Sequence, residues 1–483
     1  MHPRAFPPEI WSQVFQHLPK SHQKNLLAIS RVFHDVAIPF VFSSIKIYFM
    51  SGGAGRPIVD TSDPSFYEAT CERLMRRSWE ILHYIARQPN FARVVKSVTV
   101  IAFTDSSSIF EQLCLEEGIR ALTNLRTFRW IGTSPRFPEH FMDSISQGLH
   151  ILVVQSALPL INIHEHNELT HLHFPIPFYY PKNVTLDSIA VDEALWTYSE
   201  AVNVSTIVED AAEALQSLMI ISTRIAVVPM RVYNTLTELE ICVVDEAHLP
   251  ELDLVFRHAI VLESLTLVGF IPHSAAAFSV LPSDAPSLPY LRSFRLSCER
   301  DFTDTFEDYP RFLCEFLQAH PILRQLHLRV AEADDTFLAA ILPVIGGLQE
   351  LEVLGLHTGR TYFSENEIML LTDNLPYRLK ALHLAIIWEH SQTNLVSLVN
   401  ALVPLPQLSF LQLYGIDVPF PPLAEDLATD LKHLKLVGLN RHLWDVDWVG
   451  SEVILTRWPK WKAKFCTEDD FDSADDAWLY KFH

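Results

Sequence analysis

The chain has 483 residues, of which 49% are hydrophobic and 20% are charged, so it can bury a large core. It carries 37 Lys and Arg residues against 58 Asp and Glu residues, and the net charge of −21 argues against nucleic acid or an anionic membrane as partner. Six scattered cysteines form no CxxC pair and no apolar segment follows a basic start, so we expect a reducing intracellular location, cytoplasmic or nuclear.

The first segment, residues 6–47, predicts two or three short amphipathic helices. Ile10, Val14 and Leu18 recur at helical spacing, and Pro7 and Pro8 suit a first helical turn, where a missing N–H costs nothing. The residues that follow Pro19 place apolar side chains on more than one helical face. About forty residues cannot enclose a core of their own, so the rest of the chain or a partner must cover them.

This segment resembles an F-box, a three-helix hook that in its family docks onto the Skp-type adaptor of cullin–RING ubiquitin ligases. Phe6 stands where the family has Leu, and Phe33 stands where it has Trp. The alternative is a pair of helices that only caps the domain behind it. The residues that carry the resemblance are Phe6-Pro7-Pro8-Glu9-Ile10, Val14-Phe15, Leu18-Pro19 and Ser30 to Ala37. The adaptor contacts that it implies are Pro7, Pro8, Ile10, Val14, Phe15, Leu18, Leu27, Ile29, Val32 and Phe33.

A repeated pattern, apolar-x-x-apolar-x-apolar, fills most of the remaining chain. The two last apolar positions predict a short strand with one buried face, and the residues between strands are enough for a loop and a helix. The helices predicted in this way span 73–87, 311–319, 336–345, 365–374 and 394–403. The best-spaced repeats begin at Leu236, Leu262, Leu291, Leu323, Leu351, Leu379, Leu408 and Leu431, and earlier ones begin at Phe42, Val95, Leu125, Leu149, Leu169 and Leu186.

The array resembles the leucine-rich repeat in its longer strand-plus-helix form, and the whole layout is similar to the F-box and repeat families of fungi. The resemblance implies an α/β fold: an N-terminal three-helix F-box followed by a curved solenoid, with parallel strands on the concave face and helices outside. The family's Asn after the strand is missing. Gly stands near that place in Leu267–Phe270, Leu413–Ile416 and Leu436–Leu439, where a positive φ would turn the chain off the strand.

The predicted organisation is a hook at 1–48, a loop and helix at 49–90, the array at 91–440, and a Trp-rich cap with a solvated acidic tail at 441–483. Between residues 191 and 236 the pattern is hard to read; we expect a helix at Glu209–Met219 and a strand at Arg224–Val228. The uncharged stretch 395–413 contains Pro404 and Pro406, so we expect a buried helix, a turn and a strand rather than a membrane span.

Motifs of catalysis are absent from the sequence, and we expect no enzymatic activity, cofactor or bound metal. A histidine cluster is the one candidate for metal binding. His171 and His173 flank Leu172 on a predicted strand, with His164 and His166 close before them, but no third ligand follows at helical spacing. Solvent-facing strand positions explain these histidines better.

Side chains that flank the middle apolar position of each strand should face the concave side, where they form a polar surface that is mixed in charge and rich in His. Such a surface suits recognition of a protein substrate, although a solvated face without a partner is the alternative. Its predicted members are Arg129, His171, His173, Glu238, Glu240, Arg295, Gln325, His327, His383, Gln412, His433 and Lys435. The two resemblances together imply a substrate receptor of a Skp–cullin–F-box ligase; a non-ligase scaffold is the alternative.

Overall fold

The computed structural model describes residues 6–18, 20–50, 64–104, 109–135, 137–155, 168–173, 208–209, 211–243, 245–269, 271, 279–281, 287–298, 309–330, 333, 335–387, 392–415 and 420–481. Pro19, His164, His166 and the predicted repeat at Leu186 lie outside them. The chain forms two compact units, Met1–Leu215 with Asp469–Asp472, and Gln216–Glu468 with Ser473–His483. In the described part of the chain, no helix is both long and apolar enough to cross a membrane.

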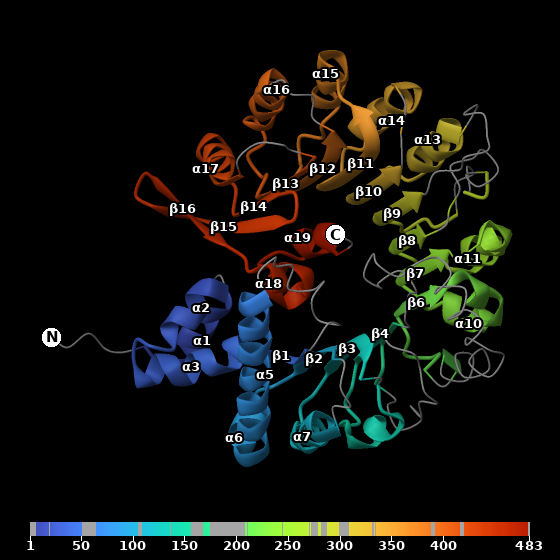
Figure 1. Ribbon diagram of the computed structural model, residues 1–483. Coiled ribbons are helices and arrows are strands. Elements are labelled where there is room, and N and C mark those ends of the chain that lie inside the picture. The colour runs from blue at the N-terminus through green and yellow to red at the C-terminus, as the bar shows by residue number, and fades with distance from the viewer. Residues whose placement is uncertain are drawn as a thin grey trace. The chain divides into compact units, whose positions relative to one another are not determined.

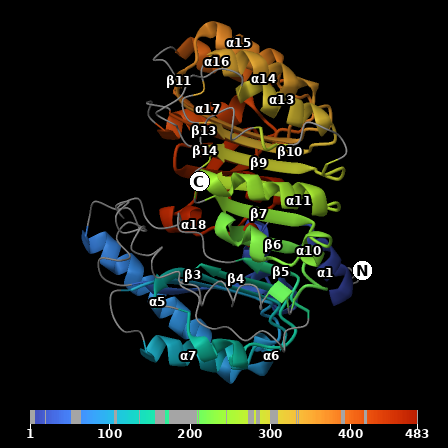
Figure 2. The same ribbon diagram turned by 90° about the vertical axis from the view of Figure 1, so that its right-hand side faces the viewer.

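The first unit consists of short N-terminal helices followed by parallel strands that pair in chain order, β1 to β5 (Figure 1; β5 is labelled in Figure 2). Its strands are β1 (Ser44–Met50), β2 (Ser97–Phe103), β3 (Thr127–Ser134), β4 (Ile151–Gln155) and β5 (His171–His173). Its helices are α1 (Pro8–Gln16), α2 (Lys20–Leu26), α3 (Arg31–Val41), α5 (Pro64–Arg87), α6 (Pro89–Ala92), α7 (Ile109–Arg120) and η1 (Glu139–Ser144).

The second unit is a longer run of parallel strands, closed at its end by an antiparallel hairpin. Its strands are β6 (Ser217–Ile221), β7 (Glu238–Val243), β8 (Ser264–Gly269), β9 (Ser293–Cys298), β10 (Gln325–Val330), β11 (Val353–Tyr362), β12 (Ala381–Ile387), β13 (Phe410–Tyr414), β14 (Leu436–Leu439), β15 (His442–Val449) and β16 (Glu452–Arg457). Its helices are η3 (Ser222–Val227), α10 (Met230–Tyr233), η4 (Glu246–Glu251), α11 (Leu252–His258), α13 (Tyr309–Ala319), α14 (Asp335–Gly347), α15 (Glu365–Asp373), α16 (Gln392–Leu402), α17 (Phe420–Asp430), α18 (Lys460–Lys464) and α19 (Ala474–Tyr480). The turn η5 (Glu468–Asp470) precedes α19.

Strand register shows that the repeats stack in phase. Leu326 of β10 lies opposite Phe294 of β9 on one side and Leu354 of β11 on the other, and all three are buried. Helices α13 to α17 lie outside these strands in Figure 1, and Figure 2 shows the same layering from the side. The expected α/β repeat array with parallel strands is therefore confirmed, and its predicted helices at 311–319, 336–345, 365–374 and 394–403 are present.

The prediction for the segment before Leu236 was wrong. Residues 217–219, which were expected to end a helix, belong to strand β6, and Arg224 and Val227 lie in the 3₁₀ helix η3 where a strand was expected. The segment in fact keeps the common pattern, because Leu215, Leu218 and Ile220 are buried and have the same spacing as the apolar residues of the other repeats. Its interval to Leu236 is shorter than the later ones, and a 3₁₀ helix with one short α-helix fills it.

The last repeat was also misread, by three residues. Val437 of β14 pairs with Leu411 of β13, so the inward-facing position of the last strand belongs to Gly438. His433 and Lys435 precede β14 and are exposed, and their assignment to the concave face was wrong. The same shift explains the glycines. Gly269 and Gly415 have the expected positive φ, at 114° and 83°, whereas Gly438 is not among the positive-φ glycines and lies within the strand.

Candidate functional site

Helices α1, α2 and α3, which we call the hook, enclose a small core of their own. Phe15 is only 1% exposed and packs with Val36 and Ala37, with Trp11 and Phe33 against them. The ring centroids of Phe15 and Phe33 are 5.3 Å apart, in an edge-on arrangement. Contacts among the three aromatic rings, together with Val36 and Ala37 of α3, therefore hold the helices in place.

Backbone caps fix where the hook's helices begin and end. The Gln23 side-chain amide donates hydrogen bonds to the carbonyl oxygens of Phe15, at 2.9 Å, and Leu18, at 3.0 Å, where α1 ends. Ser30 caps α3, because its hydroxyl oxygen accepts a hydrogen bond from the Phe33 N–H at 3.2 Å. These caps set the α1–α2 turn and the α2–α3 turn, and so the direction in which the neighbouring apolar side chains point.

The hook also carries apolar side chains that its own core leaves uncovered. Val14 is 43% exposed and Val32 is 51% exposed, and each belongs to a helix whose other face is buried. The exposed large apolar residues of the hook are Phe6, Ile10, Val14, Ile29 and Val32. Such side chains clustered in a short segment are typical of a protein-docking surface.

The ten predicted adaptor contacts fall into three groups. Phe15 is buried in the hook core, so its expected role as a contact residue is corrected: it supports the surface from below. Those that are half-buried are Leu18, Leu27 and Phe33, and those that are exposed are Pro7, Pro8, Ile10, Val14, Ile29 and Val32. Sequence pattern alone could not separate Phe15 from Val14, because both belong to the one apolar face that the spacing predicts for this helix.

In the first unit, the inward-facing side chains meet acidic residues from the C-terminal tail. The Ser44 hydroxyl donates to the Asp469 carboxylate at 2.8 Å, and Lys46 forms an ion pair with Asp470. Arg129 of β3 lies 3.8 Å from the same Asp469 carboxylate. The expectation of a solvated acidic tail was therefore wrong, because the strand face supplies hydrogen-bond donors and cations for these carboxylates.

The two histidines of β5 lie at half-buried positions on the same face of the strand. The His171 ring nitrogen Nδ1 is 2.8 Å from the Thr170 hydroxyl. Among the residues that the structure describes, no group of three or more His, Cys, Asp or Glu side chains could hold a metal ion.

In the second unit, the predicted polar face exists, but most of its members are buried. Of the residues expected to face solvent there, Glu238 is exposed and Gln325 is half-buried. Arg295 is 1% exposed, and the rings of His327 and His383 are stacked with centroids 5.8 Å apart. The buried members of the face are Glu240, Arg295, His327, His383 and Gln412.

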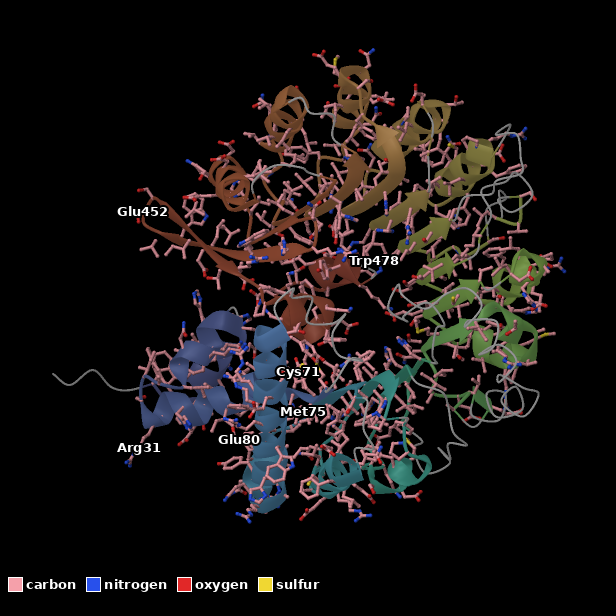
Figure 3. All side chains as sticks on the ribbon, in the orientation of Figure 1. Arg31, Cys71, Met75, Glu80, Glu452 and Trp478 are labelled. Atoms are coloured by element: carbon pink, nitrogen blue, oxygen red, sulfur yellow. The ribbon has the colours of Figure 1, made fainter. Side chains whose placement is uncertain are left out.

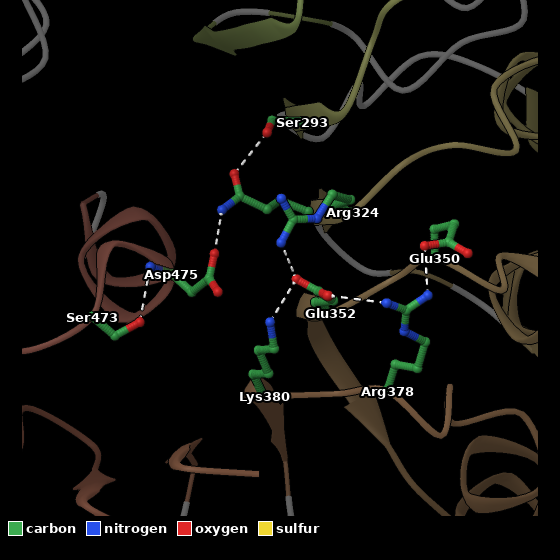
Figure 4. A network of polar contacts seen from close by, with 9 residues as sticks. Ser293, Arg324, Glu350, Glu352, Arg378, Lys380, Ser473 and Asp475 are labelled. Carbon is green, nitrogen blue, oxygen red and sulfur yellow. Dashed lines mark hydrogen bonds and ion pairs between the residues drawn. The ribbon is translucent and has the colours of Figure 1, made fainter. Parts of the chain in front are cut away.

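Helix α19 covers part of this face, in contact with β11 and β12. Figure 3 labels Trp478 on this helix, on the side of the strands opposite to α13–α17. The Arg295 guanidinium lies 4.3 Å from the centre of the Trp478 ring and also donates to the Trp478 carbonyl oxygen. The Gln325 amide donates to Asp475 at 2.7 Å while accepting from Ser293 at 2.6 Å. Figure 4 labels Ser293 and Asp475.

Beside this contact, an ionic cluster joins the starts of three neighbouring strands (Figure 4). Glu352 is buried and binds Arg324, Lys380 at 3.0 Å and Arg378 at 3.5 Å. Burial by itself raises the pKa of Glu352, but the hydrogen bonds and charges of Arg324 and Lys380 outweigh it, so the pKa lies below its ordinary value. This cluster holds the strand starts in register.

No protein-family model and no curated protein matches the chain. Among solved structures, an internalin from Listeria monocytogenes is 12% identical, with 74% of this chain and 93% of that chain covered and a TM-score of 0.31. An internalin C2 from the same species is 17% identical, with 44% and 74% covered and a TM-score of 0.25. At these scores neither likeness carries weight, and the fold assignment rests on strand order and register.

Proposed function

We propose that the chain is the substrate receptor of a Skp–cullin–F-box ubiquitin ligase. In this proposal the hook binds a Skp-type adaptor, and the repeat array binds a protein substrate. Ubiquitin transfer is performed by other subunits, so the chain needs no catalytic residue, cofactor or metal of its own. It works by holding the substrate at a high effective concentration near the transferring enzyme, in the cytoplasm or nucleus.

One observation supports the adaptor-binding part most directly. The hook buries Phe15, Val36 and Ala37 in its own core. Its helices nevertheless leave Val14 and Val32 exposed to solvent. Its sequence resembles the F-box in just these helices. Helices that served only as a cap would be expected to turn their apolar side chains toward the array.

Adaptor capture by purified protein tests the proposal. Val32→Asp places a charge on the exposed side of α3 and should weaken capture of a Skp-type adaptor at least about 10-fold, because a carboxylate would be buried unpaired in an apolar interface. Val396→Asp is the matched control, since Val396 also lies on a helix and is 56% exposed, against 51% for Val32. This control should capture the adaptor normally.

One further variant separates loss of binding from loss of folding. Ile29→Asp should also abolish capture while the circular dichroism and the melting temperature stay unchanged, because Ile29 is exposed. If Val32→Asp and Ile29→Asp captured the adaptor as well as Val396→Asp, the hook would not be an adaptor site. The chain would then be a scaffold whose N-terminal helices only cap the array.

A further inference from the structure

The two faces of the second unit's sheet differ in chemistry. Side chains on the helix side of each strand are apolar, such as Leu326 and Leu328 of β10. Side chains on the opposite side are polar in successive strands, for example Thr266, Arg295 and His327. Burying polar groups costs free energy unless each finds a partner, so a segment that covers a polar face must match it group by group. A polar face that is matched in this way has the composition of a recognition surface.

Three side chains of this face contact the C-terminal helix and the residue after it, at tail positions that lie three residues apart. Gln325 of β10 donates to Asp475 at 2.7 Å, and Arg295 of β9 binds both the ring and the carbonyl of Trp478. Glu240 of β7 forms an ion pair with Lys481 at 2.6 Å. The three tail positions, Asp475, Trp478 and Lys481, follow one another at a spacing of three, which places them along one side of a helix.

Room for the helix is made by a glycine on the strand face. A Cβ atom at Gly355 of β11 would lie 3.0 Å from Leu479 Cδ1 and 2.1 Å from His327 Cδ2. Leu479 is fully buried, and its neighbour Tyr480 is buried as well. The face thus accommodates one apolar side chain of the helix, Leu479, next to Gly355 and makes three polar contacts with the tail.

The helix itself is held by this face. It has seven residues, Ala474 to Tyr480, and helices of that length are unstable alone in water. Ser473 caps its start, accepting a hydrogen bond from the Asp475 N–H at 3.2 Å. Its order therefore depends on contacts with the strands, as the order of a bound peptide does.

We propose that the inner face of β7 to β12 binds protein segments that place a carboxylate, an aromatic ring and a cation at three-residue spacing along one side of a short helix, and that Ser473–Lys481 is an intramolecular occupant of this site. The proposal rests on the function proposed above, because it names the class of substrate that the array would take. A substrate segment of this pattern replaces the tail, which re-forms its helix when the substrate leaves.

The attached tail sets a threshold for substrate binding. A segment joined to its site by a short linker has an effective concentration of about 1 mM. If the tail segment binds the open face with a Kd of about 10 µM, the attached tail weakens the apparent binding of a competing peptide about 100-fold. Release of the tail is then a means of switching the site on.

A chain that folds intact and is then cut tests the proposal. A specific protease site inserted between Asp472 and Ser473 allows cleavage after folding, and the probe is a fluorescent synthetic peptide of residues 473–483. After cleavage, the labelled peptide should exchange with the cut tail and bind about 100-fold more tightly than it binds the intact chain. Peptides with Trp478→Ala or Asp475→Asn should bind at least about 10-fold more weakly. A peptide with the exposed Ala474 changed to Ser is the matched control and should bind normally.

Three results would overturn the proposal. The first is unfolding of the array on cleavage, which would make the tail part of the core. The second is equal binding of the labelled peptide to intact and cut protein, and the third is equal binding of the Trp478→Ala and control peptides. Adaptor capture, measured on the same cut protein, separates the two proposals. Peptide exchange without adaptor capture would contradict only the ligase assignment, and adaptor capture without peptide exchange would contradict only the tail's role.

Discussion

Substitution of Phe15 by Ala should melt the hook and leave the array folded. Phe15 is 1% exposed and its ring meets Phe33 at 5.3 Å and Trp11 at 6.2 Å, so truncation removes a buried aromatic side chain that the site cannot refill. Such changes cost about 3–5 kcal/mol. The hook's helices have 9, 7 and 11 residues, too short to persist without their shared core.

Amide hydrogen exchange measures this effect by segment. The free energy of opening α1 to α3 should fall by about 3–5 kcal/mol, which raises the open fraction by roughly two to three and a half orders of magnitude. Amides of β9 and β10 should keep their protection. Val14→Ala is the neighbouring control and should change exchange by less than about 0.5 kcal/mol, because Val14 is 43% exposed. Equal protection of α1 in both variants would refute the assignment of Phe15 to a core.

Gly269→Ala should lower the stability of the second unit by about 2 kcal/mol or more, as measured by thermal melting, because Gly269 has φ +114° and a Cβ there would lie 2.2 Å from the carbonyl oxygen of Val243. The control Gly347→Ala should show no loss of stability, because a Cβ at Gly347 would have nothing within 4 Å. Glu352→Gln should lower stability at pH 7 by about 1.5–3 kcal/mol. Because the pKa of Glu352 is lowered, its contribution is complete above about pH 4.3 and is lost as the pH falls through the folded value, so melting temperatures of variant and parent should converge in acid. Burial raises the pKa of Cys314 to about 11, aided by Glu315, so mass spectrometry at pH 8 should find it alkylated roughly 100-fold more slowly than a free thiol; modification at the free-thiol rate would contradict that burial.

The parallel array was predictable because its signal is local and repeated. Alternation of apolar residues fixes which face of a strand is buried, and strands such as β10 follow directly from Leu326 and Leu328. The same rule predicts the wrong register, here by three residues, where two overlapping sets of apolar residues both fit the pattern. At the last repeat, Leu431, Leu434 and Leu436 fit the pattern as well as Leu434, Val437 and Leu439 do, and only strand pairing decides between them.

The covering of the inner face could not be predicted in the same way. Burial of Arg295 depends on contact with Trp478, 183 positions away, and no periodic pattern links the two. Composition misled as well, because Asp469, Asp470 and Asp475 form an acidic run of the kind that is usually solvated. What the sequence did contain was a matching set of donors and cations on the strand face, among them Lys46 and Arg129. This match can be recognised only once it is known that the C-terminal tail packs against the strand face.

The position of α19 in the chain has a consequence for synthesis on the ribosome. Lys481 is made 241 residues after its partner Glu240, which at 5–20 residues per second is a delay of about 10–50 s. During that interval the nascent strands from β7 onward are exposed without the helix that later covers them. A chaperone or partner that acts during translation therefore finds this face uncovered, because the C-terminal tail of the chain has not yet been synthesised.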